Sequence, residues 1–327
     1  NITTAEKDEA LKTAADCLVA ATSEILEANC ADIERAQAAG TPDAVIDRLR
    51  LDTSRVDAMG EGLRHLVALT DPIGKTVEQW TRPNGLEIQK IRVPLGVVAI
   101  IYENRPNVTS DAFGLCLKSG NAAFLRGSSA AIDSNIAIAR ALREGITKAG
   151  LPEDALMLVT DTSHAAAIEF MQLRDHIDCL IPRGGPSLIN SILDNAKVPY
   201  VIDSDGNCHV YVDEAADLDL ATKVIVNAKM QRPSVCNAAE SLVLHSQIAP
   251  SFLPRVTDAL KGVELVGDKR AQDLVPSIQP ATEEDWSTEY LDLKMSVRIV
   301  DNIDEAIHTH THAHTTHTTQ TTHTTHT

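Results

Sequence analysis

One cysteine stands in a polar loop, where a thiol could act as a nucleophile. The residues from Gln231 to Asn237 read QRPSVCN, and Arg232 precedes Cys236 by four positions. A neighbouring cation favours the thiolate form of cysteine, which attacks carbonyl carbons and forms thioesters. The alternative is that Cys236 is a small buried apolar residue, which is the expectation for the other five cysteines: Cys17, Cys30, Cys116, Cys179 and Cys208.

A second polar loop, Tyr102–Asn107 with the sequence YENRPN, directly follows a strongly apolar run. The side-chain amide of Asn104 could donate a hydrogen bond to a developing oxyanion. The guanidinium of Arg105 could hold a carboxylate or a phosphate. The alternative is a polar loop that only caps the end of a strand.

Two further loops contain glycine next to arginine. Arg183–Ser187 reads RGGPS, and its glycines would let backbone N–H groups approach a phosphate at the start of a helix. Arg126–Ser129 reads RGSS and could reach a ribose or a 2′-phosphate. Neither loop matches the dinucleotide fingerprint GxGxxG.

Composition limits the classes of partner. The 327 residues carry 29 Lys and Arg against 46 Asp and Glu, a net charge of −17, which disfavours nucleic acid and anionic membrane as partners. No apolar run reaches the roughly 18 residues of a membrane helix. The N-terminus lacks the layout of a signal peptide, so a cytoplasmic location is expected. No CxxC pair is present, and we expect no metal site.

The elements that must position these loops alternate along the chain. Residues 3–39 predict one long helix that starts at a Thr3–Glu6 capping box. A second helix is expected to open at Thr41–Pro42, and a third at about 54–69. Strand and helix patterns then alternate, which predicts a doubly wound parallel sheet. Its ligands should bind at the carboxyl ends of the strands. The predicted strands lie near 86–93, 96–102, 122–125, 155–159, 179–181 and 200–202.

A second α/β region begins near Gly206, with predicted strands at 209–212, 242–245 and 297–300 and helices at 218–230 and 248–260. Residues 308–327 contain only His, Thr, one Ala and one Gln, so they cannot bury an apolar core. The predicted domains are therefore 1–206, 207–307 and a low-complexity tail, 308–327.

Several long motifs together resemble the aldehyde dehydrogenase superfamily, and within it the gamma-glutamyl phosphate reductases. The resemblance spans about residues 5–307. Its motifs are VPLGVVAIIYENRPNVTSDAF (93–113), LKSGNAAFLRGSSAA (117–131), IPRGGPSLI (181–189), DSDGNCHVYVD (203–213) and QRPSVCNAAE (231–240). It implies an aldehyde dehydrogenase-like fold with a second, catalytic α/β domain.

The resemblance also implies an activity and roles for particular residues. The expected reaction is NADPH-dependent reduction of glutamyl 5-phosphate through a thioester, in an enzyme that forms a homo-oligomer when intact. Cys236 falls at the catalytic cysteine and Asn104 at the oxyanion-hole asparagine, and Arg105 is assigned to the substrate carboxylate from its chemistry alone. The residues expected to bind NADP(H) are Arg126, Gly127, Ser128, Arg183, Gly184, Gly185, Ser187 and Glu289.

Two features of the sequence depart from relatives of this kind. The His/Thr tail stands where the superfamily continues its catalytic domain, so a non-catalytic, nucleotide-binding or partner-binding relative is the alternative function. Asp203 aligns with the glutamate that activates water in hydrolytic members, and its shorter side chain predicts slow hydrolysis of the thioester.

Overall fold

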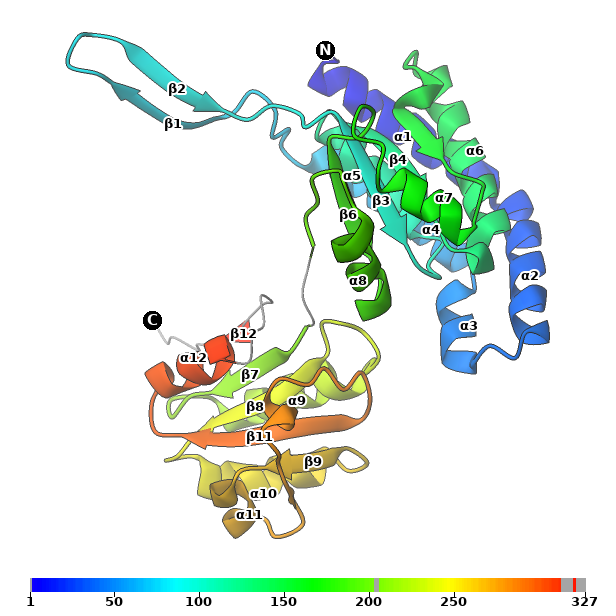
Figure 1. Ribbon diagram of the computed structural model, residues 1–327. Coiled ribbons are helices and arrows are strands. Elements are labelled where there is room, and N and C mark those ends of the chain that lie inside the picture. Colours follow the sequence, from blue (N-terminus) through cyan, green and yellow to red (C-terminus); the bar gives the residue numbers. More distant parts are fainter. Residues whose placement is uncertain (1, 203–205, 313–319, 322–327) are drawn as a thin grey trace. The chain divides into compact units, whose positions relative to one another are not determined.

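The computed structural model describes residues 2–202, 206–312 and 320–321 of the chain. These residues belong to two compact units, Asn1–Ile202 and Asp203–Thr327 (Figure 1). The predicted boundary after residue 206 lies close to this division. Each unit is built around its own parallel sheet.

Helices form the start of unit 1: α1 (Thr4–Ala20), α2 (Thr22–Ala38), α3 (Asp43–Leu49) and α4 (Thr53–Ala68). The capping box between Thr3 and Glu6 is present at α1. The prediction of one helix over residues 3–39 was wrong, because the chain leaves helical geometry at Ala21. The hydroxyl of Thr22 donates to the carbonyl oxygen of Val19 at 2.6 Å, a local bond that competes with the helical ladder.

The sheet of unit 1 is parallel throughout and has the strand order β5-β4-β3-β6. Its chain order is β3 (Val97–Tyr102), α5 (Val108–Lys118), β4 (Ala122–Arg126), η1 (Ser129–Ala131), α6 (Ile132–Lys148), η2 (Glu153–Ala155), β5 (Leu156–Leu158), α7 (His164–Phe170), β6 (Cys179–Arg183) and α8 (Pro186–Asn195). From β3 the chain proceeds outward to β4 and β5, and then returns to β6 on the other side of β3. The switch point of the sheet therefore lies between β3 and β6.

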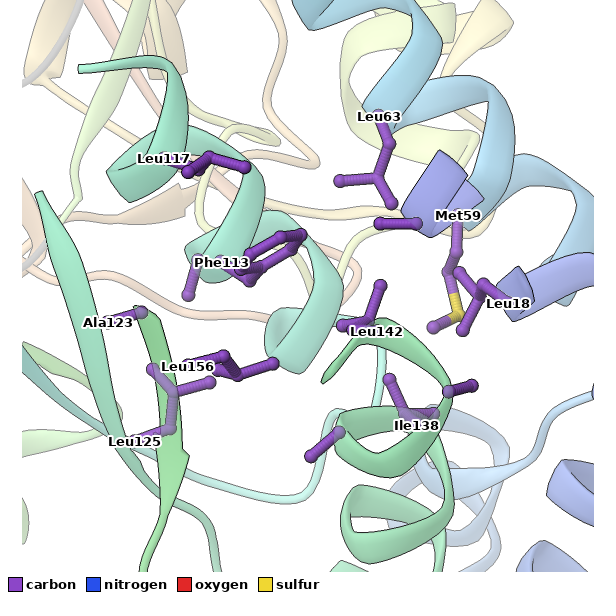
Figure 2. Packing of buried hydrophobic residues seen from close by; sticks show 14 of the residues in the cluster. Leu18, Met59, Leu63, Phe113, Leu117, Ala123, Leu125, Ile138, Leu142 and Leu156 are labelled. Atoms are coloured by element: carbon purple, nitrogen blue, oxygen red, sulfur yellow. The ribbon is translucent and has the colours of Figure 1, made fainter. Parts of the chain in front are cut away.

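Alternate residues of β3 enter two different cores, as a strand covered on both faces requires. Val98 and Ile100 pack in a cluster with helices α1, α4, α5 and α6, whereas Ala99 and Ile101 pack with α7 and α8. Figure 2 shows part of the first cluster, where Phe113 and Leu142 lie between the sheet and the N-terminal helices. The prediction of a doubly wound sheet is confirmed.

A two-stranded antiparallel hairpin, β1 (Thr76–Thr81) and β2 (Glu87–Ile91), precedes this sheet. Figure 1 shows it projecting from the rest of unit 1. The strand predicted near 86–93 corresponds to β2, and β1 was not predicted. The strand predicted at 200–202 was wrong, because only Tyr200 forms a bridge, to Leu180.

Unit 2 has a sheet of order β10-β9-β11-β8-β7-β12 whose neighbours are all parallel. Its chain order is β7 (Cys208–Val212), α9 (Leu218–Met230), β8 (Ala239–His245), α10 (Ala249–Ala259), β9 (Glu264–Gly267), α11 (Lys269–Leu274), β10 (Gln279–Pro280), η3 (Glu284–Trp286), β11 (Lys294–Val300), α12 (Ile303–His312) and β12 (Gln320–Thr321). The predicted strands and helices of this region are present. The short elements β9, α11 and β10 were not predicted.

Candidate active site

Three of the polar loops meet at the carboxyl edge of the sheet of unit 1. Strand β3 pairs with β4 up to Ile101 and Arg126, and with β6 up to Tyr102 and Arg183. The loops that follow these strands are therefore neighbours, and they contain all the site residues predicted in unit 1. They are Asn104, Arg105, Arg126, Gly127, Ser128, Arg183, Gly184, Gly185 and Ser187.

Asn104 is held by the loop that follows β4. Its Oδ1 accepts a hydrogen bond from Ser128 Oγ at 2.6 Å. This bond occupies the acceptor of the side-chain amide and orients it, so that the Nδ2 group remains as the donor. An oxyanion requires a donor of this kind.

A carboxylate bridges the switch point between β3 and β6. Glu103 Oε1 accepts a hydrogen bond from the backbone N–H of Gly185 at 3.2 Å, at the N-terminus of α8. A Cβ on Gly184 would lie 2.7 Å from Cδ of Glu103, so a larger residue at this position would displace the carboxylate. The N–H of Gly185 thus faces an anionic oxygen, as it would face a phosphate.

Arg126 is buried at the end of β4, with 9% of its surface exposed. Its Nη2 donates to the carbonyl oxygens of Thr162 and Ser163, at 3.0 and 2.8 Å. Burial lowers the pKa of Arg126, and nearby Asp161 opposes that shift. Within the described part of the chain its Nε has no hydrogen-bond partner. This burial shows that Arg126 is not a solvent-facing end of its strand.

Gly127 is needed for packing beneath the loops. A Cβ at this position would lie 2.1 Å from Nδ2 of Asn135. Asn135 belongs to a buried chain of hydrogen bonds in which the hydroxyls of Tyr102 and Thr109 lie 2.8 Å apart and Thr109 donates to Asn135 Oδ1 at 3.1 Å. Burial raises the pKa of Tyr102 well above its ordinary value. The Tyr102 hydroxyl therefore stays protonated, and this chain of hydrogen bonds carries no charge.

The remaining predicted residues of unit 1 lie nearer the surface. Arg183 and Ser187 are exposed, and Arg105 is half-buried at the start of the turn that leads into α5. The structure therefore places two cationic side chains and a hydroxyl around the same sheet edge that carries Asn104.

Unit 2 contributes the cysteine, at the amino ends of its strands. Cys236 is exposed and precedes β8, and Glu289 precedes β11. Gly206, which precedes β7, lies against both, because a Cβ there would be 2.8 Å from the carbonyl oxygen of Cys236 and 3.3 Å from Glu289 Oε1. Three segments of unit 2 thus converge on the predicted nucleophile.

Two side chains next to Gly206 hold these segments together. The thiol of Cys208 donates to the carbonyl oxygen of Cys236 at 3.3 Å. The buried Nδ2 of Asn207 donates to the carbonyl oxygens of Trp286 and Thr288, at 3.1 and 3.3 Å. Burial raises the pKa of Cys208, and Cys236 and the acidic residues nearby raise it further.

The sequence prediction missed a charged pair whose members flank the Cys236 loop in the chain. Lys229 and Glu240 are 0% and 1% exposed, and their Nζ and Oε2 atoms are 2.7 Å apart. The available signal was a lysine and a glutamate inside apolar patterns on either side of QRPSVCNAA. Such charges are rarely buried unless they are paired.

Asn104 belongs to unit 1 and Cys236 to unit 2. Asp203 lies outside the described residues, as does most of the tail. In the part of the chain that the structure describes, no group of three or more His, Cys, Asp or Glu side chains could hold a metal ion. Among the same residues no helix is long and apolar enough to cross a bilayer.

Comparison with known proteins gives a consistent result. The model of the aldehyde dehydrogenase family matches residues 1–294. The gamma-glutamyl phosphate reductase of Clostridium novyi is 51% identical over 308 residues, which are 94% of this chain and 74% of that protein. The enzyme of the same name from Heliobacterium modesticaldum is 52% identical over 303 residues, 92% of this chain and 73% of that protein.

Solved structures agree with these relatives. The crystal structure of gamma-glutamyl phosphate reductase from Thermotoga maritima is 44% identical and superposes with a TM-score of 0.87 over 96% of this chain and 76% of that chain. The protein of that name from Saccharomyces cerevisiae is 26% identical, with a TM-score of 0.58 over 98% of this chain and 81% of that chain.

Proposed function

The chain belongs to the aldehyde dehydrogenase family, and on that premise we propose that it catalyses the NADPH-dependent reduction of L-glutamyl 5-phosphate to L-glutamate 5-semialdehyde. The relatives that match most of this chain at about half identity carry the name of that activity. The single structural observation that supports it is the convergence of Gly206, Cys236 and Glu289 in unit 2.

Cys236 is the nucleophile of the proposed reaction. Its thiolate attacks the acyl carbon of glutamyl phosphate, the bond from that carbon to the phosphate oxygen breaks, and inorganic phosphate leaves as the thioester forms. Sulfur suits both halves of the reaction, because a thiolate is a strong nucleophile and also a good leaving group. The exposure of Cys236 supports this role, since an acyl phosphate must reach it.

Asn104 stabilises the tetrahedral oxyanion through its Nδ2 group. The bond from Ser128 fixes the orientation of the amide before substrate arrives, and a donor that is already oriented needs no reorganisation during the reaction. Arg105 holds the carboxylate of the substrate. Both assignments belong to the loop that follows β3.

The carboxyl edge of unit 1 would hold NADP(H). The N–H of Gly185 and the start of α8 fit a phosphate, because a carboxylate oxygen already accepts from that N–H. Among the described residues the buried Nε of Arg126 has no hydrogen-bond partner, and we assign Arg126 to the ribose or its 2′-phosphate. Ser128, Arg183 and Ser187 border the same edge, and Glu289 would hold the nicotinamide ribose. When bound, NADPH supplies the hydride for the reduction of the acyl group. The C–S bond to Cys236 then breaks and the semialdehyde is released.

The acceptor of the acyl group distinguishes this function from that of a hydrolytic aldehyde dehydrogenase. The test runs the reaction in reverse, with glutamate semialdehyde and NADP⁺, with and without inorganic phosphate. We expect sustained NADPH formation only with phosphate, and at most one turnover without it. Sustained NADPH formation without phosphate, with free glutamate as the product, would refute the phosphorylating assignment. Binding of NADP⁺ without formation of NADPH or an acyl-enzyme would support the non-catalytic alternative.

A further inference from the structure

We propose that Lys229 and Glu240 are positioning residues that fix the loop of Cys236 relative to the segment of Glu289; their role in catalysis rests on the proposed function. We place their effect on Cys236 in the backbone segments that carry it. The two residues act on it through the two ends of its loop and through one backbone amide.

The ion pair closes the loop at its base. Lys229 lies in the last turn of α9, and Glu240 is the second residue of β8, so the loop with Cys236 runs between them. The Nζ–Oε2 distance is 2.7 Å and both side chains are fully buried. The end of the helix and the start of the strand, which flank the Cys236 loop in the chain, are therefore joined directly.

The second oxygen of the same carboxylate reaches the segment of Glu289. Glu240 Oε1 accepts a hydrogen bond from the backbone N–H of Leu291 at 3.2 Å. Leu291 has a φ of 53°, and it is the only non-glycine residue with positive φ in the described part of the chain. A leucine rarely adopts this conformation, so the hydrogen bond to its amide helps to hold the backbone in it. One carboxylate thus links both segments that carry predicted site residues in unit 2.

Stability alone is a poor explanation for a pair of this kind. Burying two charges costs desolvation free energy that their attraction offsets only in part, and apolar residues of similar volume often serve as well. A buried ion pair with exact partners can instead specify one arrangement of the chain. Here the arrangement specified is that of the Cys236 loop and residues 289–291.

Two double variants separate positioning from folding. Lys229→Met/Glu240→Gln removes both charges and keeps an oxygen that can accept from Leu291. Lys229→Met/Glu240→Leu removes the charges and that acceptor together. Neither leaves a lone buried charge, which is the main cause of misfolding in the single variants. Circular dichroism checks folding, and Lys229→Met/Glu240→Met replaces the second variant if it does not fold.

The first readout is amide hydrogen exchange, which does not depend on activity. We expect exchange at residues 289–292 to be about tenfold faster in the variants with Leu or Met at position 240 than in the one with Gln, because only they lose the acceptor of the Leu291 amide. Exchange in α10 is the control and should not change. Equal exchange at 289–292 in wild type and in both kinds of variant would overturn the proposal.

The second readout is the steady-state reaction. We expect kcat to fall about ten- to hundredfold in the variants without the acceptor while KM stays within about twofold, because the nucleophile is misplaced but the binding loops of unit 1 are intact. The Gln variant keeps the acceptor but loses the ion pair at the base of the loop, so its kcat should lie between those of the wild type and of the variants without the acceptor. Equal kcat in the two kinds of variant would overturn the positioning role. If the wild-type chain has no turnover, the proposed function fails, and hydrogen exchange still decides whether the pair fixes these segments.

Discussion

The candidate site residues of unit 1 lie at the carboxyl ends of its strands, and those of unit 2 lie at the amino ends of its strands. In unit 1 the loops with Asn104, Arg126 and Gly185 follow the carboxyl ends of parallel strands, as general rules for such sheets require. In unit 2 the segments with Cys236 and Glu289 precede the amino ends of theirs. The first edge is organised by the sheet itself, whereas the second depends on side chains that join distant segments.

The largest expected contrast concerns the thiols of the two units. Burial, with a further contribution from Cys179, raises the pKa of Cys116 in unit 1 to about 12, so its thiolate is scarce at pH 8. We expect iodoacetamide to label Cys116 about a thousandfold more slowly than Cys236, because the thiolate is the reactive form. Peptide mapping over time measures both rates, and exposed Cys30 is the control within the same chain. Comparable labelling of Cys116 and Cys236 would contradict this difference.

The next contrast compares two buried lysines. In unit 2, Lys229→Met leaves Glu240 unpaired and fully buried, and we expect a loss of about 3–5 kcal/mol in the free energy of unfolding. In unit 1, Lys7→Met leaves Asp71, whose side chain is 12% exposed, in contact with Thr4 and the amide of Ile73, so the loss should be smaller. Hydrogen exchange in α9 and in α1 measures each unit separately. An equal loss in the free energy of unfolding for both variants would show that the ion pair of Lys229 contributes no more than that of Lys7.

Arg126 tests whether the edge in unit 1 selects the cofactor. We expect Arg126→Ala to lower the ratio of NADPH to NADH affinity about tenfold, through loss of a charge-assisted contact. Arg143→Ala is the control, since Arg143 pairs with Glu153 and Asp154 on another part of the unit. Titrations followed by NADPH and NADH fluorescence give both affinities. If both affinities fall equally, Arg126 serves only to hold the carbonyl groups of Thr162 and Ser163.

Among these substitutions, Glu103→Gln should have the smallest effect, and it should act on NADPH affinity. Its carboxylate accepts from the N–H of Gly185, where we propose that a phosphate binds. Glu103→Gln removes a negative charge at the N-terminus of a helix, and we expect NADPH affinity to rise about two- to fivefold at low ionic strength. The gain should disappear in high salt. Weaker binding in Glu103→Gln would mean that the carboxylate supports the loop that receives the cofactor.

The difference between the edges also explains what could be predicted from the sequence. The alternation of apolar runs and helices predicted the sheet of unit 1, and the carboxyl-edge rule then brought Asn104 and Gly185 together. The polar loop made Cys236 a candidate nucleophile. Its assignment as the catalytic cysteine and the role of Glu289 came only through resemblance, because no general rule directs ligands to the amino ends of strands. The contact between Lys229 and Glu240 was missed because it requires both charges to be buried, which depends on tertiary packing. The break at Ala21 was missed because the apolar spacing of Leu11, Leu18 and Ile25 continues across it.

The central claim is that Cys236 carries the acyl group. The most direct measurement incubates the chain with glutamate semialdehyde and NADP⁺ in the absence of phosphate, quenches it in acid, and locates the adduct by intact mass and peptide mapping. The account predicts one glutamyl group per chain, on Cys236, that hydroxylamine removes, and no adduct in Cys236→Ala. An adduct on another residue, or NADPH formation by Cys236→Ala at the rate of the unmodified chain, would contradict it.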